Sequence, residues 1–89
     1  MATVVYSRAA LARIEQACQE TPPAARVIQS AVESLAAHPL LGRRIEGELR
    51  ELVISCGRTG HLALYRFLMQ RDEVRVLALR TQRELGFLA

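Results

Sequence analysis

The chain has 89 residues, of which 51% are hydrophobic and 24% charged, and its formal net charge is +3. This length favours a single domain, which buries only about 60–65% of the surface that its unfolded chain exposes. No apolar run approaches the roughly 18 residues of a membrane span, and the first residues lack the pattern of a signal peptide. We therefore predict a cytoplasmic protein with no membrane partner. The spacing of the two cysteines and two histidines predicts no metal site, and we predict no other cofactor.

All 12 basic residues are arginine. Because the planar guanidinium binds carboxylates and phosphates through paired hydrogen bonds, such a surface suits an acidic protein or a nucleic acid. The net charge alone does not choose between these two kinds of partner.

The first 37 residues predict one strand and two helices. Residues 3–7 are rich in β-branched side chains, which is typical of a strand, and Ser7 is placed to cap a helix that starts near Arg8. A second helix begins at Thr21-Pro22-Pro23 and ends before Pro39, since proline pushes the preceding residue out of the helical region. Each helix carries one apolar stripe: Leu11, Ile14 and Cys18 on the first, and Ala25, Ile28, Val32 and Leu35 on the second.

A predicted loop over residues 39–48 precedes three apolar segments of strand length. They span Leu49–Cys56, His61–Met69 and Glu73–Arg80, with turns at residues 57–60 and 71–72. The predicted order is therefore β-α-α-β-β-β. It describes an α+β fold in which an N-terminal strand and a helical hairpin join a mainly antiparallel sheet, with the hairpin on one face.

A symmetric turn at residues 57–60 would place Glu51 opposite Arg66 and would make both sheet faces apolar. One face would carry Leu52, Ile54, Ala63, Tyr65, Phe67, Val76 and Ala78, and the other Val53, Leu62, Leu64, Leu77 and Leu79. Two short helices cover only one face, so we predict that a partner binds the other. A homodimer contact, or the chain's own loops and tail, would be the alternative cover.

Four motifs together resemble the RelE/ParE family of type II toxin–antitoxin toxins. They are HPLLGR at 38–43, LRELVI at 49–54, GHLALYR at 60–66 and VLALRTQRELGF at 76–87, and they follow one another along nearly the whole chain. The resemblance implies a toxin that a cognate antitoxin neutralises through an acidic, partly disordered segment. On the second apolar face, the antitoxin-binding candidates are Leu62, Leu64, Arg66, Leu77 and Leu79.

The family has two branches, which fold alone does not separate. RelE-like members cleave mRNA on the ribosome with basic residues and a C-terminal Tyr, whereas ParE-like members inhibit DNA gyrase. Here Lys is absent, Leu62 stands where a family Arg is expected, and Phe87 replaces the Tyr. His61, Arg83 and Glu84 are the only weak candidates for nuclease chemistry.

The motifs favour the ParE branch, so we predict a gyrase inhibitor that acts by binding and not by catalysis. Arg80, Arg83 and Phe87 are the predicted target-binding residues, two cations and an apolar anchor. The alternatives are a ribosome-dependent mRNA endonuclease and a decayed, non-toxic family member.

Overall fold

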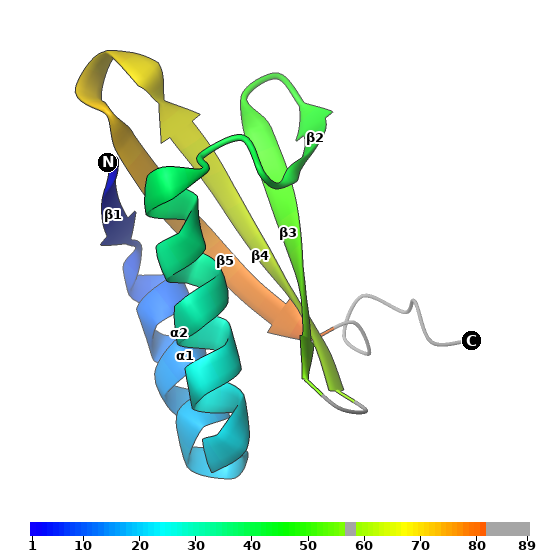
Figure 1. Ribbon diagram of the computed structural model, residues 1–89. Helices are drawn as coiled ribbons and strands as arrows, with labels where there is room; N and C mark the ends of the chain where they lie inside the picture. Colours follow the sequence, from blue (N-terminus) through cyan, green and yellow to red (C-terminus); the bar gives the residue numbers. More distant parts are fainter. Residues whose placement is uncertain (57–58, 82–89) are drawn as a thin grey trace.

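The computed structural model describes residues 1–56 and 59–81, which form a five-stranded sheet with two helices on one face (Figure 1). The predicted α+β fold and its element order are confirmed, with one additional short strand. The elements are β1 (Thr3–Tyr6), α1 (Arg8–Glu20), α2 (Pro22–Ala37), β2 (Arg43–Glu46), β3 (Leu49–Cys56), β4 (Thr59–Leu68), a 3-10 turn (Met69–Arg71) and β5 (Glu73–Thr81).

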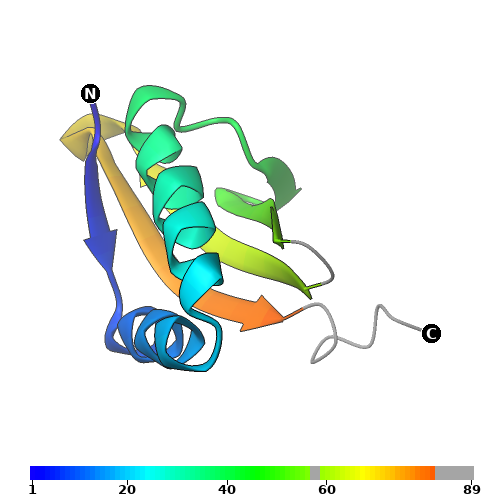
Figure 2. The ribbon, with the colours of Figure 1, turned by 60° about the horizontal axis from the view of Figure 1, so that its bottom comes forward.

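The sheet has the order β1-β5-β4-β3-β2. Strand β1 runs parallel to β5, and every other neighbouring pair is antiparallel. Figure 2 shows α2 crossing the sheet, with α1 beside α2 and viewed nearly end-on. The core lies between the helices and the sheet, with Tyr65, Ile28 and Leu35 among its largest fully buried side chains.

Strand β2 was predicted as part of a loop. Its four residues are all exposed, so the sequence there lacks the apolar alternation that marks a half-buried strand. The strand forms because Gly47 adopts a positive φ of 56°, which closes a tight hairpin onto β3. The Nε of Arg44 donates a 2.6 Å hydrogen bond to the Gly47 carbonyl and holds that turn.

Helix α1 begins where predicted, and Ser7 joins it to the sheet. The Ser7 Oγ accepts a 3.0 Å hydrogen bond from the Ala10 N–H and donates a 2.7 Å hydrogen bond to the Leu77 carbonyl. Replacing Ser7 with Ala removes both bonds and should lower the free energy of unfolding by about 1–2 kcal/mol. Urea denaturation should show this loss. The control is Ser30→Ala at an exposed position of α2, which should change the free energy of unfolding little. Equal stabilities of the two variants would contradict this joint role.

The apolar stripes are partly as predicted. In α2, Ile28, Val32 and Leu35 are buried, but the fourth buried position is Ala24 and not Ala25. In α1 the predicted stripe lines a groove between the two helices, and Leu11 is 46% exposed. Ile14 of this stripe packs against the core, together with the small side chains of Ala10 and Ala17. Alanine side chains let a helix lie close to a sheet. A prediction that follows only the large apolar residues does not identify such a buried alanine face.

The predicted register between β3 and β4 is wrong by two residues. Cys56 pairs with Thr59, so Ile54 lies opposite His61 and Leu52 opposite Ala63. Because a shift of two residues preserves the alternation of side chains, the predicted faces of β3 and β4 remain correct. The predicted Glu51–Arg66 pair does not form: Glu51 lies opposite Leu64, and its carboxylate binds Arg43 of β2 instead.

A β-bulge in β5 changes which face its last residues occupy. Leu64 pairs with Ala78 but Tyr65 pairs with Val76, so Leu77 is an extra residue without a partner in β4. The bulge reverses the predicted faces of Ala78 and Leu79. Leu79 is 2% exposed and belongs to the core, whereas Ala78 lies opposite Leu64 on the face away from the helices.

Candidate functional site

The sheet face away from the helices, here called the open face, is defined in β3 and β4 by Val53, Leu62, Leu64 and Arg66, and in β5 by Ala78 and Arg80. Val53 is 54% exposed, Leu64 and Ala78 are half-buried, and Leu62 is buried. The predicted second apolar face therefore exists, but its exposed apolar surface is narrower than the sequence indicated. Of the antitoxin-binding candidates, Leu62, Leu64 and Arg66 lie on this face. Leu77 is half-buried at the bulge, and the bulge turns Leu79 away from this face into the core.

Arginines surround the apolar part of the open face. Two of them are neutralised within the fold, since Arg43 binds Glu51 and Arg75 binds Glu73 with N and O 3.0 Å apart. Arg66 and Arg80 are exposed and have no ion pair or hydrogen bond with another residue that the structure describes. Arg66 also lies directly opposite Arg75 of the neighbouring strand β5, whose charge Glu73 compensates.

The predicted target-binding residues are only partly within the structure. Arg80 is exposed near the end of β5 and lies opposite Leu62. Arg83, Glu84 and Phe87 lie outside the described residues. Arg66 and Arg80 flank the open face. Arg80 lies opposite Leu62, which precedes Arg66 by four residues in β4, a distance of roughly 13 Å at the rise of a strand.

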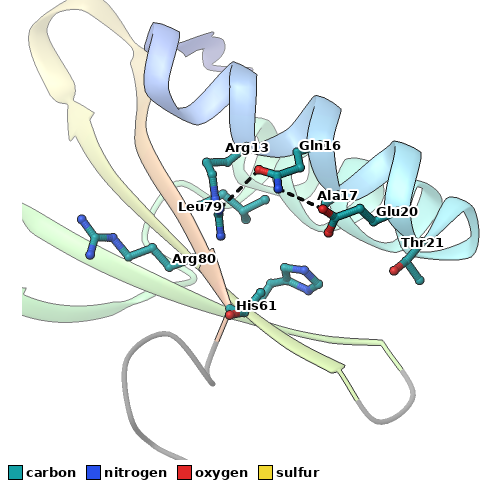
Figure 3. A pocket seen from close by; sticks show the side chains of 9 residues that line it. Arg13, Gln16, Ala17, Glu20, Thr21, His61, Leu79 and Arg80 are labelled. Atoms are coloured by element: carbon teal, nitrogen blue, oxygen red, sulfur yellow. Dashed lines mark hydrogen bonds between the residues drawn. The ribbon is translucent and has the colours of Figure 1, made fainter.

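His61 lies on the helix side of the sheet, where it faces a pocket beside α1 (Figure 3). Its side chain is buried, and the Nδ1 atom has no hydrogen-bond partner among the described residues. Burial lowers the pKa of His61 below its ordinary value of 6.5, and the positive charge of Arg13 lowers that pKa further. The imidazole is therefore neutral at pH 7.

Of the weak nuclease candidates only His61 lies within the described residues, since Arg83 and Glu84 are outside them. His61 pairs with Thr81 and Leu62 with Arg80, so the His61 and Arg80 side chains project from opposite faces of the sheet. In Figure 3 the Arg80 guanidinium is directed away from His61. Catalytic groups must lie within hydrogen-bond reach of one substrate. In the described fold His61 and the target-binding candidate Arg80 therefore do not act on the same substrate.

In the part of the chain that the structure describes, no group of three or more His, Cys, Asp or Glu side chains is placed to hold a metal ion. Within the same residues, neither helix has the length and apolar character needed to cross a membrane.

Solved toxin structures share this fold. The protein superposes on a chain of the intact E. coli RelBE toxin–antitoxin complex with a TM-score of 0.74 and 10% identity, covering 90% of this chain and 95% of that chain. It also superposes on a metal-bound toxin from Helicobacter pylori with a TM-score of 0.62 and 14% identity, covering 96% and 99%. No significant match was found among curated protein sequences. The two helices on one face of this sheet define a RelE-like toxin fold.

The family follows from the sequence itself. Residues 4–86 match the ParE toxin of type II toxin–antitoxin systems, parDE. The chain therefore belongs to this toxin family, and the resemblance to RelE/ParE toxins, closer to the ParE branch, is confirmed.

Proposed function

We propose that this ParE-family toxin acts in the cytoplasm by binding and inhibiting DNA gyrase, and that a cognate antitoxin neutralises it through an acidic segment. Family membership supports the toxin role, and the arrangement of charges supports the mode of action. The observation that carries the proposal is the open face, where apolar Val53 and Leu64 lie among exposed arginines. These groups are suited to binding a partner, and His61, the weak nuclease candidate within the described residues, lies on the other face of the sheet.

The open face supplies two complementary kinds of contact. Val53 and Leu64 offer apolar surface, while Arg66 and Arg80 provide cations that lack an acidic partner among the described residues. An acidic segment that folds on binding could cover this apolar strip and place carboxylates against both arginines.

Purified toxin tests the choice between gyrase and the ribosome. Added to gyrase and relaxed plasmid, the toxin should inhibit supercoiling and increase the amount of cleaved DNA held in gyrase complexes. The same preparation should leave translated mRNA uncut in a toeprinting assay. Codon-specific cleavage of the mRNA without any effect on gyrase would overturn the proposal and favour the ribosome-dependent endonuclease. Normal growth on induced expression would overturn both and favour a decayed member.

A further inference from the structure

The two edge strands of the sheet differ in how well they are protected against pairing with another strand. Strand β2, at one edge, carries Arg43, Arg44 and Glu46, and its pairing with β3 is irregular between Arg44 and Glu46. Charged side chains and bulges are features by which natural sheets prevent edge-to-edge contact. Strand β1, at the other edge, has the sequence TVVY, with no charge or proline and with a regular pairing to β5. The edge formed by β1 is therefore the one open to pairing.

The backbone of β1 presents hydrogen-bonding groups along this edge. The Thr3 N–H and the Ser7 N–H each donate a 2.9 Å hydrogen bond to a carbonyl within residues 72–76, so the odd-numbered residues face β5. Because successive residues of a strand direct these groups to opposite sides, those of Val4 and Tyr6 point away from β5. They have no backbone partner among the described residues, and Figures 1 and 2 show no helix or strand beyond β1 at this edge.

The side chains of β1 are also suited to a neighbouring strand. Valine and tyrosine both favour strands, yet Val5 and Tyr6 are each 37% exposed. Val5 lies opposite Arg75, on the side of the open face, whereas Tyr6 lines the groove between α1 and α2 on the helix side. A strand placed beside β1 would cover part of both side chains.

We propose that β1 is a self-association edge, at which two copies of this chain pair antiparallel about a twofold axis at Val5. In this register Val4 lies opposite Tyr6 of the second copy, and the two Val5 residues face each other. In an antiparallel pair, alternate opposing residues exchange two backbone hydrogen bonds. The two Val4–Tyr6 pairs would therefore form four hydrogen bonds and use all the outward-facing backbone groups of these residues.

The symmetry of β1 about Val5 favours a second copy in this register. An axis at Val4 would bring Ala2 into the pairing, but the Ala2 N–H already donates a 2.8 Å hydrogen bond to a carbonyl of α2. An axis at Tyr6 would require Arg8, which is the first residue of α1 and not part of the strand. An uncharged strand also avoids the like-charge contacts that a symmetric pair of charged strands creates.

The contact is small, so the dimer should be weak. Four residues from each copy cover less than the roughly 1,200–2,000 Å² of a stable protein interface. We expect a dissociation constant of about 100 µM. By mass action, most chains would then be monomeric at about 10 µM, and roughly one-fifth at about 1 mM.

Amide hydrogen exchange of the isolated full-length toxin, followed by NMR, tests this pairing residue by residue. Between about 10 µM and 1 mM protein, exchange at the Val4 and Tyr6 amides should slow about fourfold, in proportion to the remaining monomer. The Thr3 and Ser7 amides are the internal references. Their exchange should not change with concentration, because both donate hydrogen bonds within one chain.

Charges placed at the axis test the register. Val5→Lys puts two like charges directly opposite each other and should keep the protein monomeric at about 1 mM in analytical ultracentrifugation. Val5→Glu should behave in the same way. An equimolar mixture of the two variants should recover dimers, because a lysine then faces a glutamate, and this recovery also shows that both are folded. Ile45→Lys, at an exposed position of β2, is the matched control and should dimerise like the unmodified protein.

Several results would overturn the proposal. One is exchange at Val4 and Tyr6 that does not depend on protein concentration. Another is self-association that persists in Val5→Lys, since the copies would then meet at a different surface, such as the open face. A mixture of the two Val5 variants that stays monomeric would exclude the axis at Val5. Protection of the two amides only after an antitoxin is added would show that this edge receives an unrelated strand. None of these measurements involves gyrase or growth inhibition, so their outcome is independent of the proposed function.

Discussion

Replacing Gly42 with Ala is expected to lower the free energy of unfolding by about 3 kcal/mol. A Cβ on Gly42 would lie 2.6 Å from Cε1 of Tyr65, 2.7 Å from its hydroxyl oxygen and 2.7 Å from the Glu51 carbonyl. These neighbours have little freedom to move, because Tyr65 is fully buried and the carbonyl belongs to β3. The added methyl group would therefore force apart the loop after α2 and the sheet.

The same substitution would disturb the hydrogen bonds around Tyr65. The Tyr65 hydroxyl accepts a 2.8 Å bond from the Gly42 N–H and donates a 2.8 Å bond to the Pro39 carbonyl. The Arg50 guanidinium donates another 2.8 Å bond to the Gly42 carbonyl. A small domain has only a few kcal/mol of net stability, so losing about 3 kcal/mol would leave much of the protein unfolded at 37 °C.

Gly47→Ala is the matched control for this prediction. Gly47 has a positive φ of 56°, but nothing lies within 4 Å of its added Cβ, so the change introduces backbone strain without a clash. We expect a loss of about 1 kcal/mol from that strain. Urea denaturation followed by circular dichroism gives both values. A Gly42→Ala protein that is no less stable than Gly47→Ala would show that the close approach to Tyr65 is unimportant.

Tyr65→Phe tests whether Gly42 and Tyr65 act as a pair. Alone, it removes the hydroxyl and leaves the Gly42 N–H and Pro39 carbonyl without that partner, at a cost of about 1–2 kcal/mol. In the Gly42→Ala protein the hydroxyl is one of the clashing groups, so removing it should cost less than it does in the unmodified protein. Strict additivity of the two changes would contradict direct coupling.

The fold was predictable because its signals are local and repeated. Capping by Ser7, the helix end before Pro39 and three apolar segments separated by turns define the element order. What the sequence did not reveal depends on single residues in special geometry. The bulge at Leu77 has no distinctive residue type, yet it moves Leu79 from the predicted partner-binding face into the core. The predicted register between β3 and β4 was wrong because register depends on the length of the connecting loop. The two glycines at positions 57 and 60 leave that length ambiguous in the sequence.

The candidate site was less predictable, because it depends on which charges the fold neutralises. The sequence does not show that Glu51 binds Arg43. Because of that ion pair, Arg66 has no carboxylate partner among the described residues. The environment of His61 was equally hidden. An isolated histidine at a strand position indicates neither burial nor the approach of Arg13 from a helix 48 residues earlier in the chain.

The largest functional effect is expected from Arg80, near the end of β5, together with Arg83, which lies outside the described residues. Replacing Arg80 and Arg83 together with Ala should abolish growth inhibition on induced expression, while the midpoint of thermal unfolding stays nearly unchanged. The physical reason is clearest for Arg80, which is exposed and makes no ion pair with another described residue, so its removal should cost little stability. Its guanidinium remains available to bind carboxylates or phosphates of a target.

Two single variants separate this role from a general effect of charge. Arg26→Ala removes the same charge from the exposed side of α2 and should leave toxicity intact. Arg66→Ala removes the other open-face arginine that lacks a described partner, and it should weaken antitoxin binding by about 10- to 100-fold, as expected on loss of a charged hydrogen bond. If the Arg80 and Arg83 double variant unfolds at a much lower temperature, these arginines stabilise the fold and the loss of toxicity has a structural cause. If it stays folded and fully toxic, the target contacts another surface.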